Sequence, residues 1–308
     1  MNDDIKSYGK SIRARLLNVA KQEKVFFQTI LTRYFQERLL YRISLTHYRN
    51  NFYLKGGALM YAYERFSARP TLDIDFLGNN ISNDGERIIS AFKEICAVPC
   101  EEDGVNFDLS HITAQNITEF KDYHGIRLSI PVTMDTIAQV MTMDIGFGDV
   151  VIPEAIPLDY PILLKHLPAI NILAYSIETV IAEKMHAVVD LADQSSRMKD
   201  YYDLYQILSA NQYDAKVLKE AIKRTFENRH AEYKADTMFF RAEYPDNAEM
   251  QVRWKAFLRK ITSKSELSFS DIVHYLQTVL KPYWENLNHE WGDSNTKINE
   301  MSNFIKRL

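Results

Sequence analysis

The chain has 308 residues, of which 46% are hydrophobic and 25% charged, and its formal net charge is −4. This composition is typical of a globular protein with an apolar core, not of a disordered or fibrous chain. No run of about 18 uncharged apolar residues occurs and the first residues are polar, so neither a membrane span nor a secretory leader is expected. The two cysteines, Cys96 and Cys100, support neither a disulfide framework nor a four-ligand zinc site, which favours a cytoplasmic protein.

Positive charge is concentrated in two segments. Residues 6–49 contain ten Lys/Arg and two Asp/Glu, and residues 216–264 contain twelve Lys/Arg and seven Asp/Glu. Separate basic surfaces of this kind could bind a polyanion such as RNA. Solvated outer faces of helices would give the same pattern, so the charge distribution alone does not decide between them.

The first third of the chain predicts helices followed by a strand, a turn and a helix. Apolar residues recur with a helical period from about residue 8 to 45 without proline, which indicates one or two helices. The segment FYLKGGALMYAYE, residues 52–64, has an apolar start, a Gly-Gly break and then good helix formers. The strand LDIDFLG follows at residues 72–78, with Leu72, Ile74 and Phe76 expected on one face.

A sheet-rich half is expected to precede a helical half. The spacing predicts a helix at 84–97, strands within 105–117, 123–134 and 138–151, and helices at 177–190 and 198–210. The remainder to Leu308 is mostly helical in pattern. We therefore expect a bilobal α+β protein, in which residues 1–165 form a lobe with a mixed sheet and flanking helices, and residues 166–308 form a helical lobe that closes over it.

Two aspartates on the predicted strand 72–78 are candidate metal ligands. Asp73 and Asp75 lie two positions apart, so they project from the same face with roughly 6–7 Å between their α-carbons. Two such carboxylates can share Mg²⁺ or Mn²⁺, which prefer oxygen ligands, and a triphosphate substrate supplies further oxygens. Alone, the D-x-D pattern also fits a strand with one solvated face.

The Gly-Gly turn before this strand is a candidate phosphate site. Gly56 and Gly57 have no side chain to keep backbone N–H groups away from a phosphate, and the following helix offers its positive end. Lys55, directly before them, could neutralise phosphate charge. The glycines could also serve only the turn conformation, and Lys55 could be an ordinary exposed lysine.

A third carboxylate lies in an apolar strand pattern. Asp144 stands between Met143 and Ile145, where an isolated carboxylate requires a reason. Together with Asp73 and Asp75 it would complete a metal triad, as a further ligand or as the general base toward an attacking hydroxyl. Asp149 is interpreted as a possible turn cap.

One lysine interrupts the apolar face of the helix predicted at 177–190. Lys184 has Val180 and Val188 four residues away on either side, so its ammonium group requires an anion. It could instead extend from the edge of the face to Asp144 or Glu183.

The pattern Lys-Gly-Gly, then Arg69-x-Thr71-x-Asp73-Ile74-Asp75-Phe76, resembles the nucleotidyltransferase superfamily related to DNA polymerase beta. Farther along the chain, two motifs are similar to the signature of the AbiEii/AbiGii toxin family. They are Glu183-Lys184, and then Arg197-x-Lys199-Asp200-x-x-Asp203-Leu204. The strand from Asp144 to Asp149 also resembles that family's third-carboxylate strand. The resemblance covers about residues 50–210.

This resemblance implies nucleotidyl transfer from a nucleoside triphosphate to an acceptor hydroxyl, with release of pyrophosphate. It implies that the acceptor is the 3′ end of a tRNA or another RNA, and that the chain is the toxin of a bacterial toxin–antitoxin pair with a cognate antitoxin. The implied metal ligands are Asp73, Asp75 and Asp144. The implied nucleotide contacts are Lys55, Gly56, Gly57, Thr71 and Lys184. The implied catalytic residues are the three metal ligands together with Lys184 and Asp200.

Two alternatives remain. The same site could modify a protein or a small molecule, because the chemistry does not depend on what carries the hydroxyl. The chain could also be a non-catalytic module that binds RNA or protein. The sequence contains neither the G-x-S-x-G motif of acyl-transfer enzymes nor the G-x-x-x-x-G-K-[ST] motif of P-loop ATPases, so neither function is predicted.

Overall fold

The chain folds into two compact units. A computed structural model describes residues 3–120, 123–231, 236–261 and 267–305; side chains are described for 8–117, 125–231, 236–261 and 267–287. The first unit comprises Met1–Asp149 and Glu154–Tyr175, and the second Val150–Pro153 and Ser176–Leu308. The boundary predicted between residues 165 and 166 lies earlier in the chain than the boundary after Tyr175, because the last strand of the first unit, Ile170–Ala174, comes between them. Among the described residues, no helix is long and apolar enough to cross a membrane.

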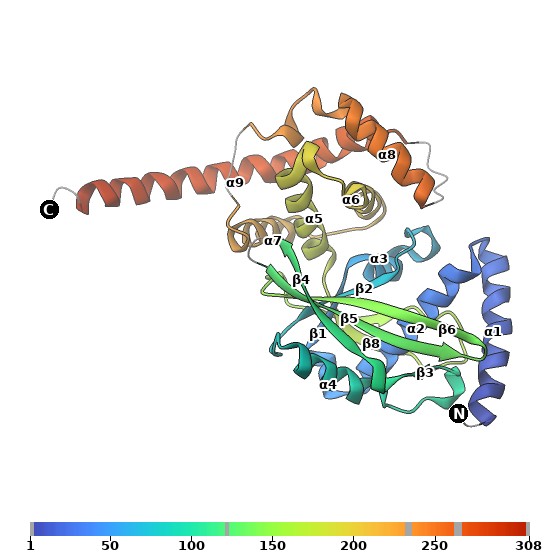
Figure 1. Cartoon of the computed structure of the whole chain (residues 1–308). Coiled ribbons are helices and arrows are strands. Elements are labelled where there is room, and N and C mark those ends of the chain that lie inside the picture. Colours follow the sequence, from blue (N-terminus) through green and yellow to red (C-terminus); the bar gives the residue numbers. More distant parts are fainter. Residues whose placement is uncertain (1–2, 121–122, 232–235, 262–266, 306–308) are drawn as a thin grey trace. The chain divides into compact units, whose positions relative to one another are not determined.

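The first unit consists of a mixed sheet with packed helices (Figure 1). Its helices are α1 (Asp3–Glu23), α2 (Phe27–Ser44), α3 (Gly56–Glu64) and α4 (Gly85–Cys96). Its strands are β1 (Phe52–Lys55), β2 (Asp73–Gly78), β3 (Asn106–Phe107), β4 (Thr113–Phe120), β5 (Tyr123–Met134), β6 (Ile137–Phe147), β7 (Ile156–Tyr160) and β8 (Ile170–Ala174). Within the described ranges the strand order is β3-β5-β6-β2-β1-β8-β7, and β4 also pairs with β5. The α+β class expected from the sequence is confirmed.

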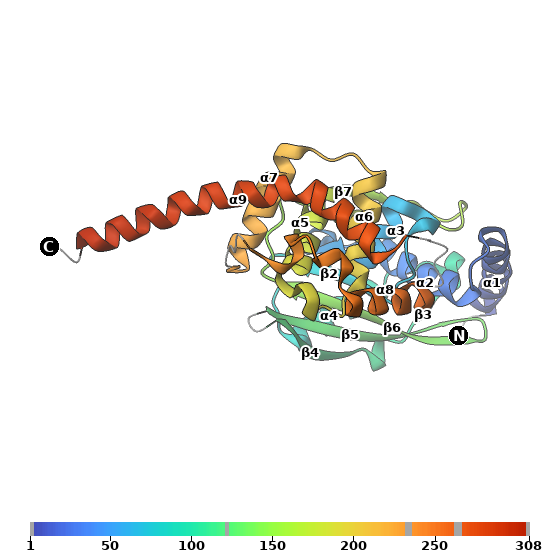
Figure 2. The same ribbon diagram turned by 90° about the horizontal axis from the view of Figure 1, so that it is seen from above.

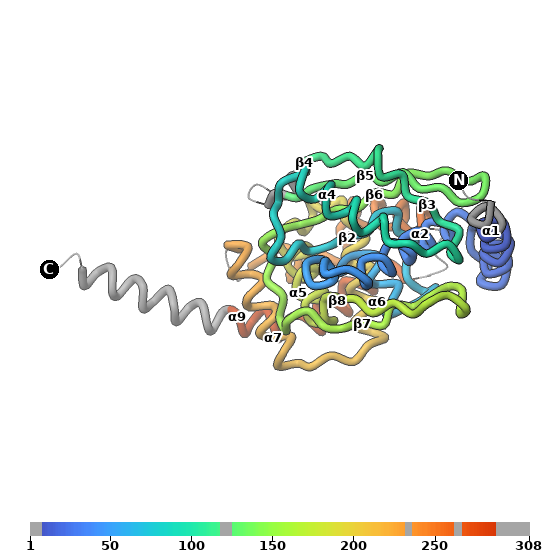
Figure 3. Tube along the Cα trace, turned by 90° about the horizontal axis from the view of Figure 1, so that it is seen from below, coloured from blue at the N-terminus to red at the C-terminus, as the bar shows by residue number. Residues whose placement is uncertain are grey.

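One face of this sheet is apolar and covered by helices. Ile74 and Phe76 of β2 are buried, as predicted, and Phe52 of β1 packs between Phe76 and Phe92 of α4, with ring centroids 5.9 and 5.0 Å away. Figure 3 shows α2 and α4 on this side. The prediction for Leu72 is wrong: it precedes β2 and is 72% exposed. Because Ile74 and Phe76 occupy the buried face of β2, the residues that alternate with them point to the opposite face, which is polar.

The β5–β6 hairpin ends against α1. Its turn lies beside the helix in Figure 1 and again from above in Figure 2. A Cβ added to Gly9 would lie 2.9 Å from the Asp135 backbone nitrogen, and the Arg13 guanidinium donates to the Asp135 carboxylate at 3.1 Å. A glycine on α1 therefore permits the close approach that fixes the hairpin turn.

The second helix of the basic N-terminal segment is buried on most sides. Arg33, Arg38 and Arg42 of α2 are between 0 and 4% exposed. For α2, neither interpretation left open by the sequence holds, a polyanion-binding surface or a solvated helix face, because these guanidinium groups face protein. The exposed cations of the segment include Lys10, Arg13 and Lys21 on α1.

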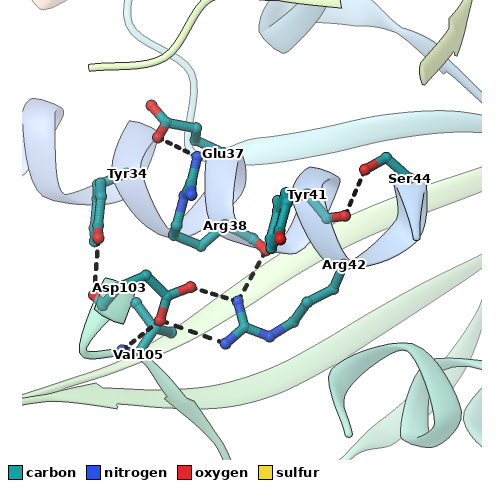
Figure 4. Close-up of polar contacts among 8 residues, drawn as sticks. All are labelled: Tyr34, Glu37, Arg38, Tyr41, Arg42, Ser44, Asp103 and Val105. Atoms are coloured by element: carbon teal, nitrogen blue, oxygen red, sulfur yellow. Dashed lines mark hydrogen bonds and ion pairs between the residues drawn. The ribbon is translucent and has the colours of Figure 1, made fainter. Parts of the chain in front are cut away.

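Two buried carboxylates pair with Arg38 and Arg42 (Figure 4), whereas Arg33 donates to the Ala68 carbonyl at 3.2 Å. Arg42 donates to both oxygens of Asp103 at 2.7 and 3.4 Å, and the Val105 backbone N–H donates to the same carboxylate at 2.9 Å. Arg38 donates to the adjacent Glu37 at 2.6 Å. The other Glu37 oxygen accepts the Leu163 backbone N–H at 2.7 Å. Buried charges require such partners, since water cannot solvate them.

The second unit is helical, as the sequence predicts. Its helices are α5 (Ile177–Leu191), α6 (Met198–Ala210), α7 (Ala215–Asn228), α8 (Ala248–Lys260) and α9 (Phe269–Ile305). Aromatic residues fill its core: Tyr201 and Tyr244 share a hydrogen bond of 2.7 Å between their hydroxyls, and the Phe269 ring packs on both.

Candidate active site

Strand alternation places both aspartates of β2 on the face opposite the apolar core. β2 lies between β1, which is antiparallel to it, and β6, which is parallel. Asp73 and Asp75 are half-buried, whereas the intervening Ile74 is fully buried. The Thr142 hydroxyl of β6 donates to the Asp73 carboxylate. The predicted same-face pair of carboxylates is therefore present in the structure.

The two glycines bring the start of α3 against this pair. β1 runs directly into α3, and Gly56 has φ +66°, in the left-handed region that disfavours side chains. A Cβ on Gly56 would overlap Asp75 Oδ2, and one on Gly57 would lie 2.7 Å from the Cβ of Thr71. The Gly57 N–H donates to Asp75 Oδ2 at 3.4 Å. The helix start thus faces a carboxylate in this structure.

Replacing Gly56 by alanine is expected to displace Asp75 and strain the backbone. The left-handed conformation alone costs roughly 1–2 kcal/mol for a residue with a Cβ. We expect lower thermal stability together with loss of any activity that depends on Asp75. The matched control is Gly85→Ala at the start of α4, where a Cβ would meet only the Ala114 side chain at 3.5 Å. Equal behaviour of the two variants in thermal unfolding and activity would contradict the steric argument.

Asp144 lies next to Asp75 but is held by an arginine that sequence analysis missed. In the β2–β6 pair, Asp75 is in register with Asp144, and in the β5–β6 pair Asp144 is in register with Arg127. The Arg127 Nε donates to Asp144 Oδ1 at 2.7 Å and Nη2 donates to Oδ2 at 2.6 Å. These hydrogen bonds and the negative charge of Asp144, with smaller contributions from Asp73 and Asp75, raise the pKa of Arg127.

The donor set at β2 fits a hard divalent cation through two carboxylates. Asp73 and Asp75 offer oxygen ligands on one face, beside a helix start that only glycine allows to come so close. In the described part of the chain, no three His, Cys, Asp or Glu side chains are grouped so that they could hold a metal ion. The three-carboxylate site that includes Asp144 therefore stays a prediction.

Lys55, which the sequence predicts to neutralise phosphate charge, contacts a carboxylate of its own unit. Its ammonium donates to Asp149 Oδ2 at 2.8 Å and lies 5.4 Å from the centre of the Tyr175 ring. Asp149, interpreted from the sequence as a turn cap, follows Gly148, whose φ is +88°. In the β1–β2 pair, Lys55 is in register with Asp75, so it lies beside the pair formed by Asp73 and Asp75.

The family motifs of the second unit form a buried ion-pair cluster. The Lys184 ammonium donates to Asp200 at 3.0 Å and to Asp203 at 2.7 Å, and Arg197 Nε donates to Asp200 at 2.7 Å. Burial would raise the pKa of Asp200, but these cations and Lys199 outweigh it and lower the pKa to about 2. The expectation that Lys184 requires an anion is confirmed, with Asp200 and Asp203 as the anions, whereas Glu183 pairs with Arg229 at 3.3 Å.

The predicted residues fall into two sets, one in each unit. Lys55, Gly56, Gly57, Thr71, Asp73, Asp75 and Asp144 gather around β2 in the first unit, whereas Lys184 and Asp200 contact each other in the second. Arg127 and Thr142 were missed. The alternation of apolar and polar residues along β5 and β6 already assigns both side chains to the polar face of the sheet. Their partners, however, depend on the register between the strands.

Comparison with known proteins identifies the class. A family model described as "Nucleotidyl transferase AbiEii toxin, Type IV TA system" matches residues 38–280. The chain is thus a nucleotidyltransferase by class. It belongs to the AbiEii family, the nucleotidyltransferase toxins of type IV toxin–antitoxin systems. No curated protein matches the sequence significantly.

Two solved structures from Helicobacter pylori are similar to this fold over most of their length. JHP933 has 15% sequence identity and a TM-score of 0.48, and the match covers 87% of this chain and 97% of that one. The second, provisionally assigned as a nucleotidyltransferase, has 12% identity and a TM-score of 0.48, over 86% of this chain and 98% of the other.

Proposed function

We propose that the chain moves a nucleoside monophosphate from a nucleoside triphosphate to an acceptor hydroxyl, using Mg²⁺ or Mn²⁺ held by Asp73 and Asp75. The observation that carries this proposal is the pair of same-face carboxylates on β2 with the Gly56–Gly57 helix start directly against Asp75. Family membership supports the reaction class, and the carboxylate pair supplies ligands for the cation that accompanies a triphosphate.

Each residue near β2 has a task in this proposal. When bound, the divalent cation neutralises the negative charge of the triphosphate. Asp73 and Asp75 anchor it, and backbone N–H groups at the start of α3 orient phosphate oxygens, with Thr71 packed against Gly57 to fix that helix start. Lys55 balances phosphate charge from the edge of the acidic pair, held in place by Asp149. Asp144 accepts the hydrogen bond of the acceptor hydroxyl.

The second unit contributes Lys184 and Asp200 to the proposal. Both belong to the motifs that resemble the family, and Lys184 is fixed by two carboxylates instead of extending freely. In the proposal, Lys184 supports triphosphate use, and Asp200 orients the Lys184 ammonium group.

We further propose an RNA acceptor, the 3′ end of a tRNA, and a cognate antitoxin as partner. The toxin family supports the antitoxin. Fewer exposed cations support an RNA acceptor than the sequence of residues 6–49 indicated, because the arginines of α2 are buried. The exposed cations of that segment include Lys10, Arg13 and Lys21 of α1.

The proposal is tested by incubating the protein with total RNA, Mg²⁺ or Mn²⁺ and each α-³²P-labelled nucleoside triphosphate in turn. We expect one or more nucleotides to label an RNA of tRNA size, with release of pyrophosphate in equal amount. A cell extract freed of RNA serves as the parallel acceptor pool. Label on a protein or a small molecule of this extract would show that the acceptor is not RNA. No label in any reaction would favour the non-catalytic binding module.

A further inference from the structure

Four neighbouring strands place a row of charged side chains across one face of the sheet. In register from β5 to β1, the row is Arg127, Asp144, Asp75 and Lys55. Adjacent strands lie about 4.8 Å apart, so the two carboxylates in the middle are close neighbours of like charge. A cation at each end of the row offsets that repulsion: Arg127 contacts Asp144 within the row, and Lys55 contacts Asp149 outside it.

Arg127 uses both oxygens of Asp144. The two N–H···O distances of 2.7 and 2.6 Å describe a bidentate pair, the geometry that best fixes a carboxylate in place. Asp73 accepts from the Thr142 hydroxyl, and Asp75 accepts from the Gly57 backbone N–H. Asp144 is therefore already neutralised by a side chain of the protein.

The arginine in this pair is accessible. The Arg127 side chain is 43% exposed, whereas the Asp144 side chain is 14% exposed. Water can solvate the guanidinium after it leaves, and half-exposed ion pairs contribute little net stability. A divalent cation nearby could thus compete with Arg127 for Asp144 without breaking a buried structure.

We propose that Arg127 is a built-in competitor of the divalent cation: it occupies both oxygens of Asp144 and so keeps the third carboxylate from binding the cation until it is displaced. Arg127 is a positioning residue in this scheme, acting through Asp144. The inference rests on the proposed function, since it assumes that Asp73 and Asp75 hold the cation.

The test measures binding of Mn²⁺ alone to the full-length protein, by electron paramagnetic resonance of free Mn²⁺ and by titration calorimetry. The proteins are wild type, Arg127→Gln, Asp144→Asn and the double variant Arg127→Gln/Asp144→Asn. Arg127→Lys keeps the charge but loses the two-pronged geometry. The matched control is Arg13→Gln, which removes another exposed arginine–aspartate pair, at the β5–β6 turn. Circular dichroism of each variant verifies the fold.

We expect Arg127→Gln to bind Mn²⁺ roughly two- to fivefold more tightly than wild type, with Arg127→Lys in between. Asp144→Asn is expected to change affinity less than twofold in the wild-type background, but to remove the whole gain in the Arg127→Gln background. Arg13→Gln should have no effect. Unchanged or weaker binding by Arg127→Gln, or no Mn²⁺ binding by either protein, would overturn the inference.

A separate variant distinguishes this outcome from failure of the proposed function. Asp73→Asn/Asp75→Asn should lose Mn²⁺ binding whatever the role of Arg127. If this variant still binds Mn²⁺ as wild type does, the metal site of the proposed function is wrong. If it loses binding while Arg127→Gln shows no gain, only the inference about Arg127 is overturned.

Discussion

Asp75→Asn is expected to lower the rate of nucleotidyl transfer by about 10³-fold or more while the fold stays intact. Neutralising the charge of a triphosphate by a coordinated cation stabilises the transition state by several kcal/mol, and each 1.36 kcal/mol corresponds to a factor of ten. Asparagine has nearly the same shape, and its carbonyl oxygen can still accept the Gly57 N–H. The substitution also removes like-charge repulsion between Asp75 and its register neighbour Asp144.

The measurement is incorporation of label from the nucleoside triphosphate, with thermal unfolding of the same preparations. Asp135→Asn is the matched control, because it removes a carboxylate of the same unit at the β5–β6 turn, and asparagine tolerates the positive φ of that residue. We expect the control to retain activity. Full activity of Asp75→Asn would remove the hypothesis that these carboxylates hold the cation.

Asp103→Asn is expected to destabilise the first unit by about 3–5 kcal/mol, because it leaves the Arg42 guanidinium buried without its counter-charge. The Arg42 and Asp103 side chains are 3% and 0% exposed, so water cannot replace the lost partner. The exposed Glu220–Arg224 pair on α7 provides the control, for which Glu220→Gln should cost less than about 0.5 kcal/mol.

The unfolding signal must report on the sheet. The three tryptophans, Trp254, Trp284 and Trp291, all belong to the second unit, so their fluorescence does not follow the first unit directly. Far-ultraviolet circular dichroism during urea unfolding reports on both units. A midpoint for Asp103→Asn equal to that of Glu220→Gln would show that this buried pair contributes little to stability.

Local patterns predicted most elements of the fold, whereas long-range partners were beyond them. The alternation of Ile74 with Asp73 and Asp75 determined the buried and polar faces of β2, because successive side chains of a strand point to opposite sides. The interaction of Arg127 with Asp144 instead depends on the register between β5 and β6, which no short stretch of sequence encodes. β7 was also missed, since a short edge strand containing Pro157 gives a weak strand pattern.

The arginines of α2 show a second limit of sequence analysis. Arginine is seldom fully buried unless it is paired, so a run of arginines is normally interpreted as a surface. Arg42 is buried because Asp103, 61 residues farther along the chain, meets it in the core. Lys184 was a clearer case, because the apolar residues on either side of it in the same helix already indicated a need for an anion.

The burial of α2 also determines which fragments of this chain can be expressed as stable proteins. The family model begins at residue 38, inside α2, whereas Ile30, Tyr34 and Phe35 of the same helix are fully buried in the first unit. A fragment cut at the family boundary would expose the sheet-facing core and separate Glu37 from Arg38. Truncations intended for crystallisation or for toxicity assays should therefore retain the whole of α2.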